Sequence, residues 1–117
     1  MHKDELKKRT KRFALRVMKL VDALPATITG RAIGAQLIRS GTAVGANYRA
    51  TCRARSTKEF IAKIGVVEEE ADESAYWMEL IVEGELLPES KVSALYREAD
   101  ELTAIMAASR ISASRRK

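Results

Sequence analysis

The sequence predicts an all-α protein, an antiparallel up-down four-helix bundle formed by residues 1–111. Four stretches carry apolar residues at helical spacing, and the breaks between these stretches are short. No stretch alternates apolar and polar residues as a half-buried strand would. The 117 residues include only two prolines and six glycines, which favours a few long helices. This length suits one domain with a modest core.

The first helix is expected over residues 4–24. Phe13, Val17 and Leu20 recur on one face of this stretch, and most of its lysines and arginines lie elsewhere, so the helix is amphipathic. Pro25 ends it, because a proline pushes the residue before it out of helical geometry.

The second helix is expected over residues 28–54, with Thr27 or Thr29 as its cap. Each glycine inside a helix costs up to ~1 kcal/mol relative to alanine, so interior glycines need a compensating close contact with a neighbour. Folding the chain back about residues 55–56 sets Gly45 opposite residues 65–66. We therefore expect the second and third helices to pack closely through glycine. The interior glycines are Gly34, Gly41 and Gly45.

The third helix is expected over residues 57–85, and it begins at a capping box formed by Ser56 and Glu59. Pro88 suits the start of a fourth helix over residues 89–110. Residues 112–117 are expected to form a basic tail beyond the bundle.

The same register places charged residues of the second and third helices side by side. Arg39 is expected opposite Asp72, and Arg31 near residues 79–83. Asn47 is expected to form a buried hydrogen bond between helices that specifies their register.

Charge is segregated along the chain, whose net charge is +5. Residues 1–20 hold eight Lys/Arg and two acids, whereas residues 57–85 hold two Lys/Arg and nine acids. The basic helix suits an anionic partner, and the acidic helix suits ion pairs within the fold or across a contact between copies.

Several enzyme classes lack the residues that they require. The only histidine is His2, so a Ser-His or Cys-His arrangement has no well-placed base. No glycine-rich phosphate loop is present, and Cys52 is the only cysteine. We expect no enzymatic activity and no cofactor. No apolar run approaches a membrane span and the first residues are charged, so we expect a cytoplasmic protein.

The acidic cluster at residues 68–73 is interpreted as surface carboxylates and ion pairs. Di-iron bundles need Glu-x-x-His pairs, which this sequence lacks, so no metal site is predicted. A carboxylate-only Mg²⁺ site is the alternative.

The candidate phosphate contacts are basic residues of the first helix and of the turn after the second. Arginine binds phosphate in a bidentate manner. For the arginines of the turn, pairing with acids of the third helix is an equally open interpretation. The predicted contacts are Lys8, Lys11, Arg12, Arg16, Arg49, Arg53 and Arg55.

Three segments carry a specific resemblance: residues 36–50 (QLIRSGTAVGANYRA), residues 53–60 (RARSTKEF), and residues 69–77 with their acidic run before Tyr76 and Trp77. The sequence resembles the four-helix-bundle family associated with intervening sequences in 23S ribosomal RNA genes, which is related to retroelement accessory variability determinant proteins. The resemblance covers about residues 13–110. It implies homopentameric rings, basic surfaces that contact nucleic acid, association with a reverse transcriptase in some relatives, and no established enzymatic activity.

Two functions follow as hypotheses. The first is an oligomeric accessory protein that binds nucleic acid, RNA in preference to DNA, without base specificity. The second is a scaffold that docks a polymerase or another protein, with an apolar contact near Trp77, Leu86 and Leu87.

Overall fold

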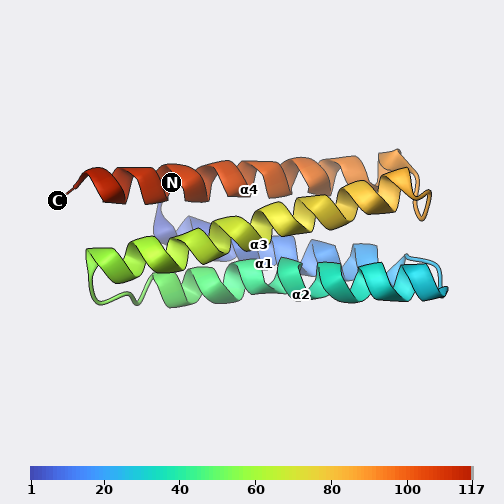
Figure 1. Ribbon diagram of the computed structural model, residues 1–117, viewed down its shortest axis with the longest axis horizontal. Coiled ribbons are helices and arrows are strands. Elements are labelled where there is room, and N and C mark those ends of the chain that lie inside the picture. The colour runs from blue at the N-terminus through green and yellow to red at the C-terminus, as the bar shows by residue number, and fades with distance from the viewer. Residues whose placement is uncertain (117) are drawn as a thin grey trace.

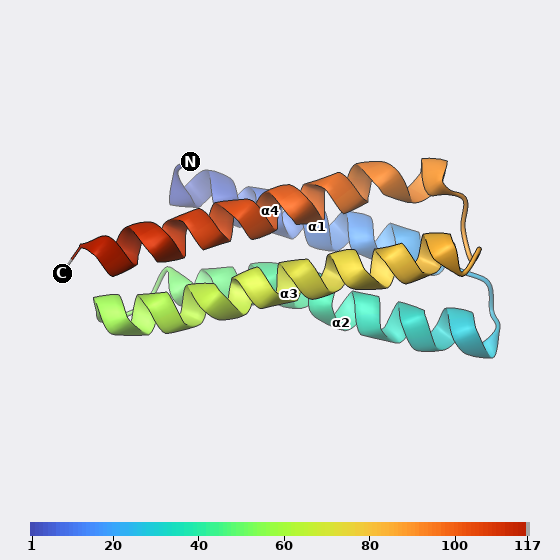
Figure 2. The same ribbon diagram turned by 45° about the horizontal axis from the view of Figure 1, so that its top comes forward.

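The computed structural model describes residues 1–116 and contains four helices in an up-down-up-down arrangement (Figures 1 and 2). The helices are α1 (Lys3–Asp22), α2 (Ile28–Thr51), α3 (Thr57–Glu83) and α4 (Glu89–Arg115). They form a rod of 49 × 21 × 19 Å. The predicted all-α four-helix bundle is confirmed.

The helix starts follow the predicted capping residues. Thr27 Oγ1 accepts a hydrogen bond from the Gly30 N–H at 3.0 Å, so Thr27 and not Thr29 caps α2. Ser56 Oγ accepts from the Glu59 N–H at 3.1 Å. Glu59 returns a contact to the N–H of Arg55 at 3.4 Å, one residue before the cap, so the α3 start is a capping box with a shifted second half.

The end of α4 differs from the expected basic tail. Helix α4 continues to Arg115, and the Ala113 side chain is 2% exposed. No proline or glycine follows residue 88, so nothing in the sequence stops the helix near residue 110. Residues 112–115 therefore belong to α4, and Lys117 lies outside the described residues.

One continuous core runs between the helices and contains fully buried side chains from all four. Within the described residues α1 packs on α2 and α4, and α3 packs on α2 and α4, whereas the backbones of α1 and α3 do not approach within 8 Å between Cα atoms. These two helices therefore lie on opposite corners of the bundle. The largest buried side chains include Phe13, Val17, Leu37, Ile64, Met78, Ile81, Leu102 and Met106.

The glycines of α2 face α1 and not α3, so the expected glycine contact between the second and third helices is wrong. A Cβ at Gly41 would lie 2.7 Å from Val17 Cγ1, and a Cβ at Gly45 would lie 3.4 Å from the Thr10 carbonyl. Folding the chain back about a turn predicts which residues lie at the same level along two neighbouring helices. It does not predict which side of each helix makes the contact.

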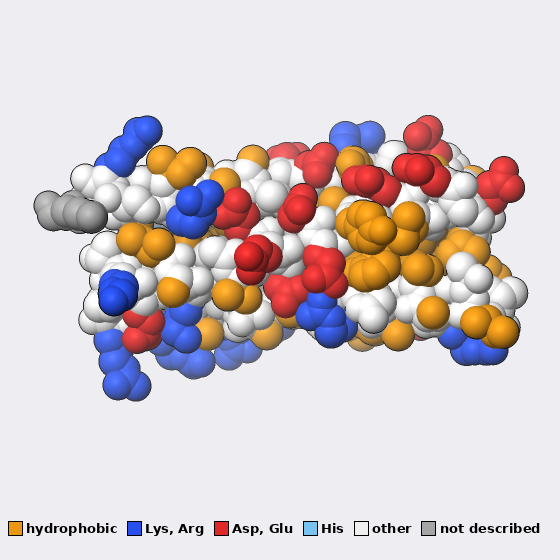
Figure 3. Space-filling view, in the orientation of Figure 1, with side chains coloured by type: hydrophobic (Ala, Val, Ile, Leu, Met, Phe, Trp, Pro, Cys, Tyr) orange, Lys and Arg blue, Asp and Glu red, His pale blue; other side chains and the backbone are white. Residues whose placement is uncertain are grey.

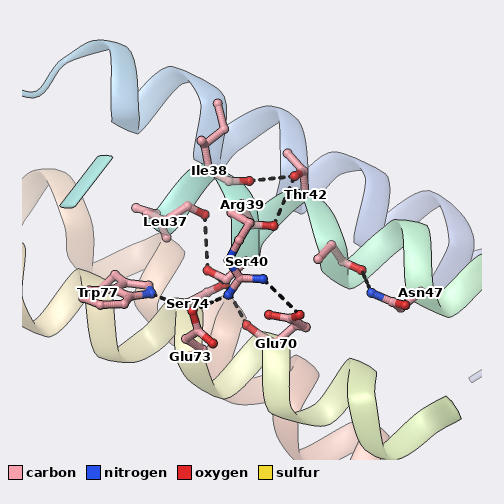
Figure 4. Close-up of polar contacts among 11 residues, drawn as sticks. Leu37, Ile38, Arg39, Ser40, Thr42, Asn47, Glu70, Glu73, Ser74 and Trp77 are labelled. Carbon is pink, nitrogen blue, oxygen red and sulfur yellow. Dashed lines mark hydrogen bonds and ion pairs between the residues drawn. The ribbon is translucent and has the colours of Figure 1, made fainter. Parts of the chain in front are cut away.

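The α2–α3 crossing is formed by serines instead. Ser74 Oγ donates to Ser40 Oγ at 2.9 Å, and both side chains are buried (Figure 4). Serine is small enough to let two helices approach closely, and this hydrogen bond satisfies polar groups that burial would otherwise leave unpaired.

The predicted partner of Arg39 is correct to within one helical turn, whereas the contact predicted for Arg31 is not formed. Arg39 pairs with Glu70 and Glu73 of α3 and not with Asp72 (Figure 4). Arg31 donates to the Ala26 carbonyl at 2.8 Å and not to the acids at 79–83.

The expected bond of Asn47 between helices is also wrong. Its Nδ2 donates to the Ala43 carbonyl of its own helix at 2.9 Å (Figure 4).

Candidate nucleic-acid interface

One end of the rod collects most of the positive charge. The N-terminus of α1, the α2–α3 turn and the C-terminus of α4 meet there (Figure 1). We call this region the basic end and define it as residues 1–11, 45–66 and 105–116. It contains thirteen Lys/Arg and only three Asp/Glu. On the face seen in Figure 3, blue side chains gather at this end and red ones over the middle and the opposite half.

A shallow groove between α1 and α2 brings three of the predicted residues together. Lys8 and Lys11 of α1 line it with Arg49 of α2, and Lys7 joins them. Its floor is formed by small side chains of both helices, so the backbones lie close to the surface. These floor residues are Ala14, Thr42, Gly45 and Ala46.

The α2–α3 turn presents two more of the predicted arginines. Arg53 and Arg55 are both exposed. Arg55 lines a second hollow beside the start of α3, with Phe60 and Arg116. The start of a helix carries a partial positive charge, which adds to the field of the two arginines.

Arg12 and Arg16 lie apart from this group. Arg12 is exposed in the middle of α1, whereas Arg16 is half-buried and lines a groove between α1 and α4 with Lys19 and Lys91. The structure thus brings Lys8, Lys11 and Arg49 together, with Arg53 and Arg55 at the adjacent turn, and leaves the other two further along the rod.

The arginines that form ion pairs from α1 or α3 to α4 were not predicted from the sequence. Arg9 holds Glu98 and Glu101 of α4 at 2.7 and 2.9 Å, and the hydrogen bond to Glu98 raises the pKa of Arg9 above its ordinary value. Arg110 holds Glu68 at 2.8 Å. Each of these contacts joins two different helices, α1 with α4 or α3 with α4, which a charge count of one helix does not reveal.

The predicted phosphate contacts are left out of these pairs. Among residues 1–116, the arginines that form ion pairs are Arg9, Arg39 and Arg110. The expected alternative, in which the arginines of the turn pair with acids of α3, is therefore absent from the described structure.

The acidic cluster of α3 is divided between different sides of that helix. Glu68 pairs with α4, whereas Glu70 and Glu73 pair with Arg39 of α2. No three potential metal ligands gather within the described part of the chain.

The apolar residues proposed for a protein contact are partly covered by the bundle itself. Trp77, Leu86 and Leu87 pack against it as partly buried side chains. Tyr76, by contrast, is 51% exposed and meets the Trp77 ring edge-on at a centroid distance of 5.1 Å. Figure 3 shows an apolar patch bordered by acids on this face.

None of the helices described is long and apolar enough to span a bilayer.

The comparisons with known proteins concern nearly the whole chain. The 23S rRNA-intervening sequence protein family matches residues 2–108. A solved protein of unknown function from the S23 ribosomal protein family of Bacteroides thetaiotaomicron is 27% identical, with a TM-score of 0.79 over 89% of this chain and 96% of that one. No curated protein matches significantly. The chain belongs to the 23S rRNA-intervening sequence protein family.

Proposed function

We propose that this protein is a non-enzymatic, oligomeric accessory protein that binds nucleic acid, with RNA as the favoured ligand, through its basic end. The observation that carries the proposal is the concentration of thirteen Lys/Arg against three acids in residues 1–11, 45–66 and 105–116; all of these Lys/Arg except Arg9 and Arg110 form no ion pair within the described residues. Unpaired cations at a surface release condensed counterions when they meet phosphates, and this release supplies most of the non-specific affinity.

The geometry favours phosphate contacts over base readout. Lys8, Lys11 and Arg49 line a shallow groove that offers charge to a backbone, and Arg53 and Arg55 continue the charge around the end of the rod. Arg12 and Arg16 extend it along α1. We therefore expect binding that depends on length and salt and hardly on sequence.

The experiment measures the affinity of a labelled single-stranded RNA by fluorescence anisotropy across a salt series. Arg53→Ala with Arg55→Ala should weaken binding to all sequences alike. It should also reduce the slope of log K against log salt by about 1.4, since each contact on a single strand contributes about 0.7. The matched control is Arg31→Ala with Arg97→Ala, which removes the same charge from exposed positions of α2 and α4 away from the basic end.

Two results would contradict the proposal. One is affinity that does not fall as salt rises. The other is an equal loss in both double variants, because net charge and not the basic end would then be responsible. The alternative function, a scaffold that docks a protein such as a reverse transcriptase, predicts that RNA binding is undetectable even at low salt.

A further inference from the structure

A hollow at the basic end brings one aromatic side chain together with two arginines. It lies between the start of α3 and the end of α4, which are side by side in Figures 1 and 2. Phe60 of α3 lines the hollow together with Arg55 of the α2–α3 turn and Arg116 at the end of α4, and the other lining residues are small. The volume of the hollow is about 410 Å³.

Within the described chain, Phe60 is the one aromatic side chain that the basic end presents to solvent. Residues 1–11, 45–66 and 105–116 contain two aromatic residues, Tyr48 and Phe60. Tyr48 is only 6% exposed. Phe60 is half-buried, because part of its side chain packs against the core and part lines the hollow. The packed part holds the ring in place, so the exposed part is a fixed apolar surface among cations.

The two arginines keep their positive charge available at the hollow. Arg55 and Arg116 are both exposed, and neither forms an ion pair within residues 1–116. Glu59, the acid next to Phe60 in the sequence, accepts from the backbone N–H of Arg55 at 3.4 Å and does not line the hollow. A guanidinium binds phosphate and an aromatic ring stacks on a nucleobase, so the hollow offers a partner to each part of a nucleotide.

We propose that this hollow binds one unpaired nucleotide, with its base stacked on Phe60 and the neighbouring phosphates held by Arg55 and Arg116. The inference rests on the nucleic-acid function proposed above and narrows its ligand to a strand with unpaired bases, because a base within a duplex cannot reach the ring.

The hollow and the α1–α2 groove then have different tasks. The lining of the groove contains no aromatic residue, so the groove contacts the sugar-phosphate backbone. The hollow adds a contact to a base. Stacking uses the π-face that every base has, so this contact raises affinity for a single strand without selecting a sequence.

The experiment compares two RNA oligomers of about 12 nucleotides, an oligouridylate and a ribose-phosphate oligomer of the same length that lacks bases. Both carry the same phosphate charge, so the difference in affinity measures contacts with bases. By fluorescence anisotropy, the wild type should bind the oligouridylate about 5-fold or more tightly, as expected for stacking of one base. In Phe60→Leu this preference should disappear, while the slope of log K against log salt stays unchanged because no cation is removed.

Three further variants separate stacking from charge and from folding. Phe60→Tyr keeps an aromatic ring and should keep the preference. Tyr76→Leu removes an exposed ring of the same helix outside the basic end, so this matched control should also keep it. Arg55→Ala with Arg116→Ala should weaken binding of both oligomers and reduce the salt slope by about 1.4.

Circular dichroism verifies that each variant is folded, and Phe60→Met, with its adaptable apolar side chain, is measured beside Phe60→Leu. Equal affinity of the wild type for the two oligomers overturns the stacking site, as does a folded Phe60→Leu or Phe60→Met that keeps the preference. If both oligomers bind equally and in a salt-dependent manner, the stacking site alone fails. If neither binds at low salt, the nucleic-acid function fails and the site fails with it.

Discussion

Gly41 of α2 packs on Val17 of α1 so closely that a Cβ at position 41 would lie 2.7 Å from Val17 Cγ1 and 2.8 Å from Cγ2. Val17 is fully buried, so its side chain has little room to move. The close contact explains why α2 tolerates interior glycines that lower its intrinsic helix propensity.

Gly41→Ala should therefore destabilise the protein, although alanine is the better helix former. Overpacking of a tight core typically costs about 1–3 kcal/mol, which exceeds the gain in propensity. Urea denaturation measures the change, and adding Val17→Ala should recover part of the loss caused by Gly41→Ala. Gly65→Ala is the control: a Cβ there meets only Arg110 Cδ at 3.9 Å, so this variant should be stabilised by up to ~1 kcal/mol. Equal effects at both glycines would contradict the packing argument.

The fold was predictable because its signals are local. Apolar spacing gave the four helices, and the start of α3 followed from Ser56 and Glu59 alone. The helix that packs against the glycines of α2 was not predictable, because it depends on how α2 is rotated about its own axis. Likewise, nothing in α1 by itself distinguishes Arg9, which holds two acids of α4, from Lys8 or Lys11, which line the candidate site.

Ser40 and Ser74 should be energetically coupled, because the hydrogen bond between them at 2.9 Å is buried at the α2–α3 crossing. Each serine hydroxyl also lies within hydrogen-bond distance of a carbonyl of its own helix, Ser40 of Leu37 and Ser74 of Glu70, so the two hydroxyl protons are shared among three acceptors. A double-mutant cycle with alanine should therefore give a coupling of about 0.5–1 kcal/mol. The control cycle combines Ser40→Ala with Thr103→Ala on α4 and should be additive. Additivity in the serine cycle would count against the contact.

Glu73 should make the environment of Trp77 depend on pH. The indole N–H of Trp77 and then the guanidinium of Arg39 hold the pKa of Glu73 below its ordinary value. A lowered pKa in the folded state contributes stability above the ordinary Glu pKa, and that contribution is lost as pH falls through the lowered value. The protein has one tryptophan, so its fluorescence reports this site directly. We expect a transition with its midpoint below the ordinary Glu pKa.

In Glu73→Gln the fluorescence transition should disappear, while stability at neutral pH falls by no more than about 0.5 kcal/mol because the pair is partly exposed. Glu69→Gln is the matched control, since Glu69 is exposed on the same helix and forms no ion pair within residues 1–116. An unchanged transition in Glu73→Gln would reject the assignment.

Ala113 should prove to be part of the packed structure and not of a free tail, because its side chain is 2% exposed in the last turns of α4. Ala113→Asp places a charge in this buried position and should cost about 1 kcal/mol or more. Ser112→Asp introduces the same charge at the same end of the helix dipole, but Ser112 is exposed, so its cost should be a few tenths of a kcal/mol. Urea denaturation gives both values, and amide hydrogen exchange should show faster exchange of the last α4 turns in Ala113→Asp alone. Indistinguishable variants would mean that α4 frays before residue 113 in solution.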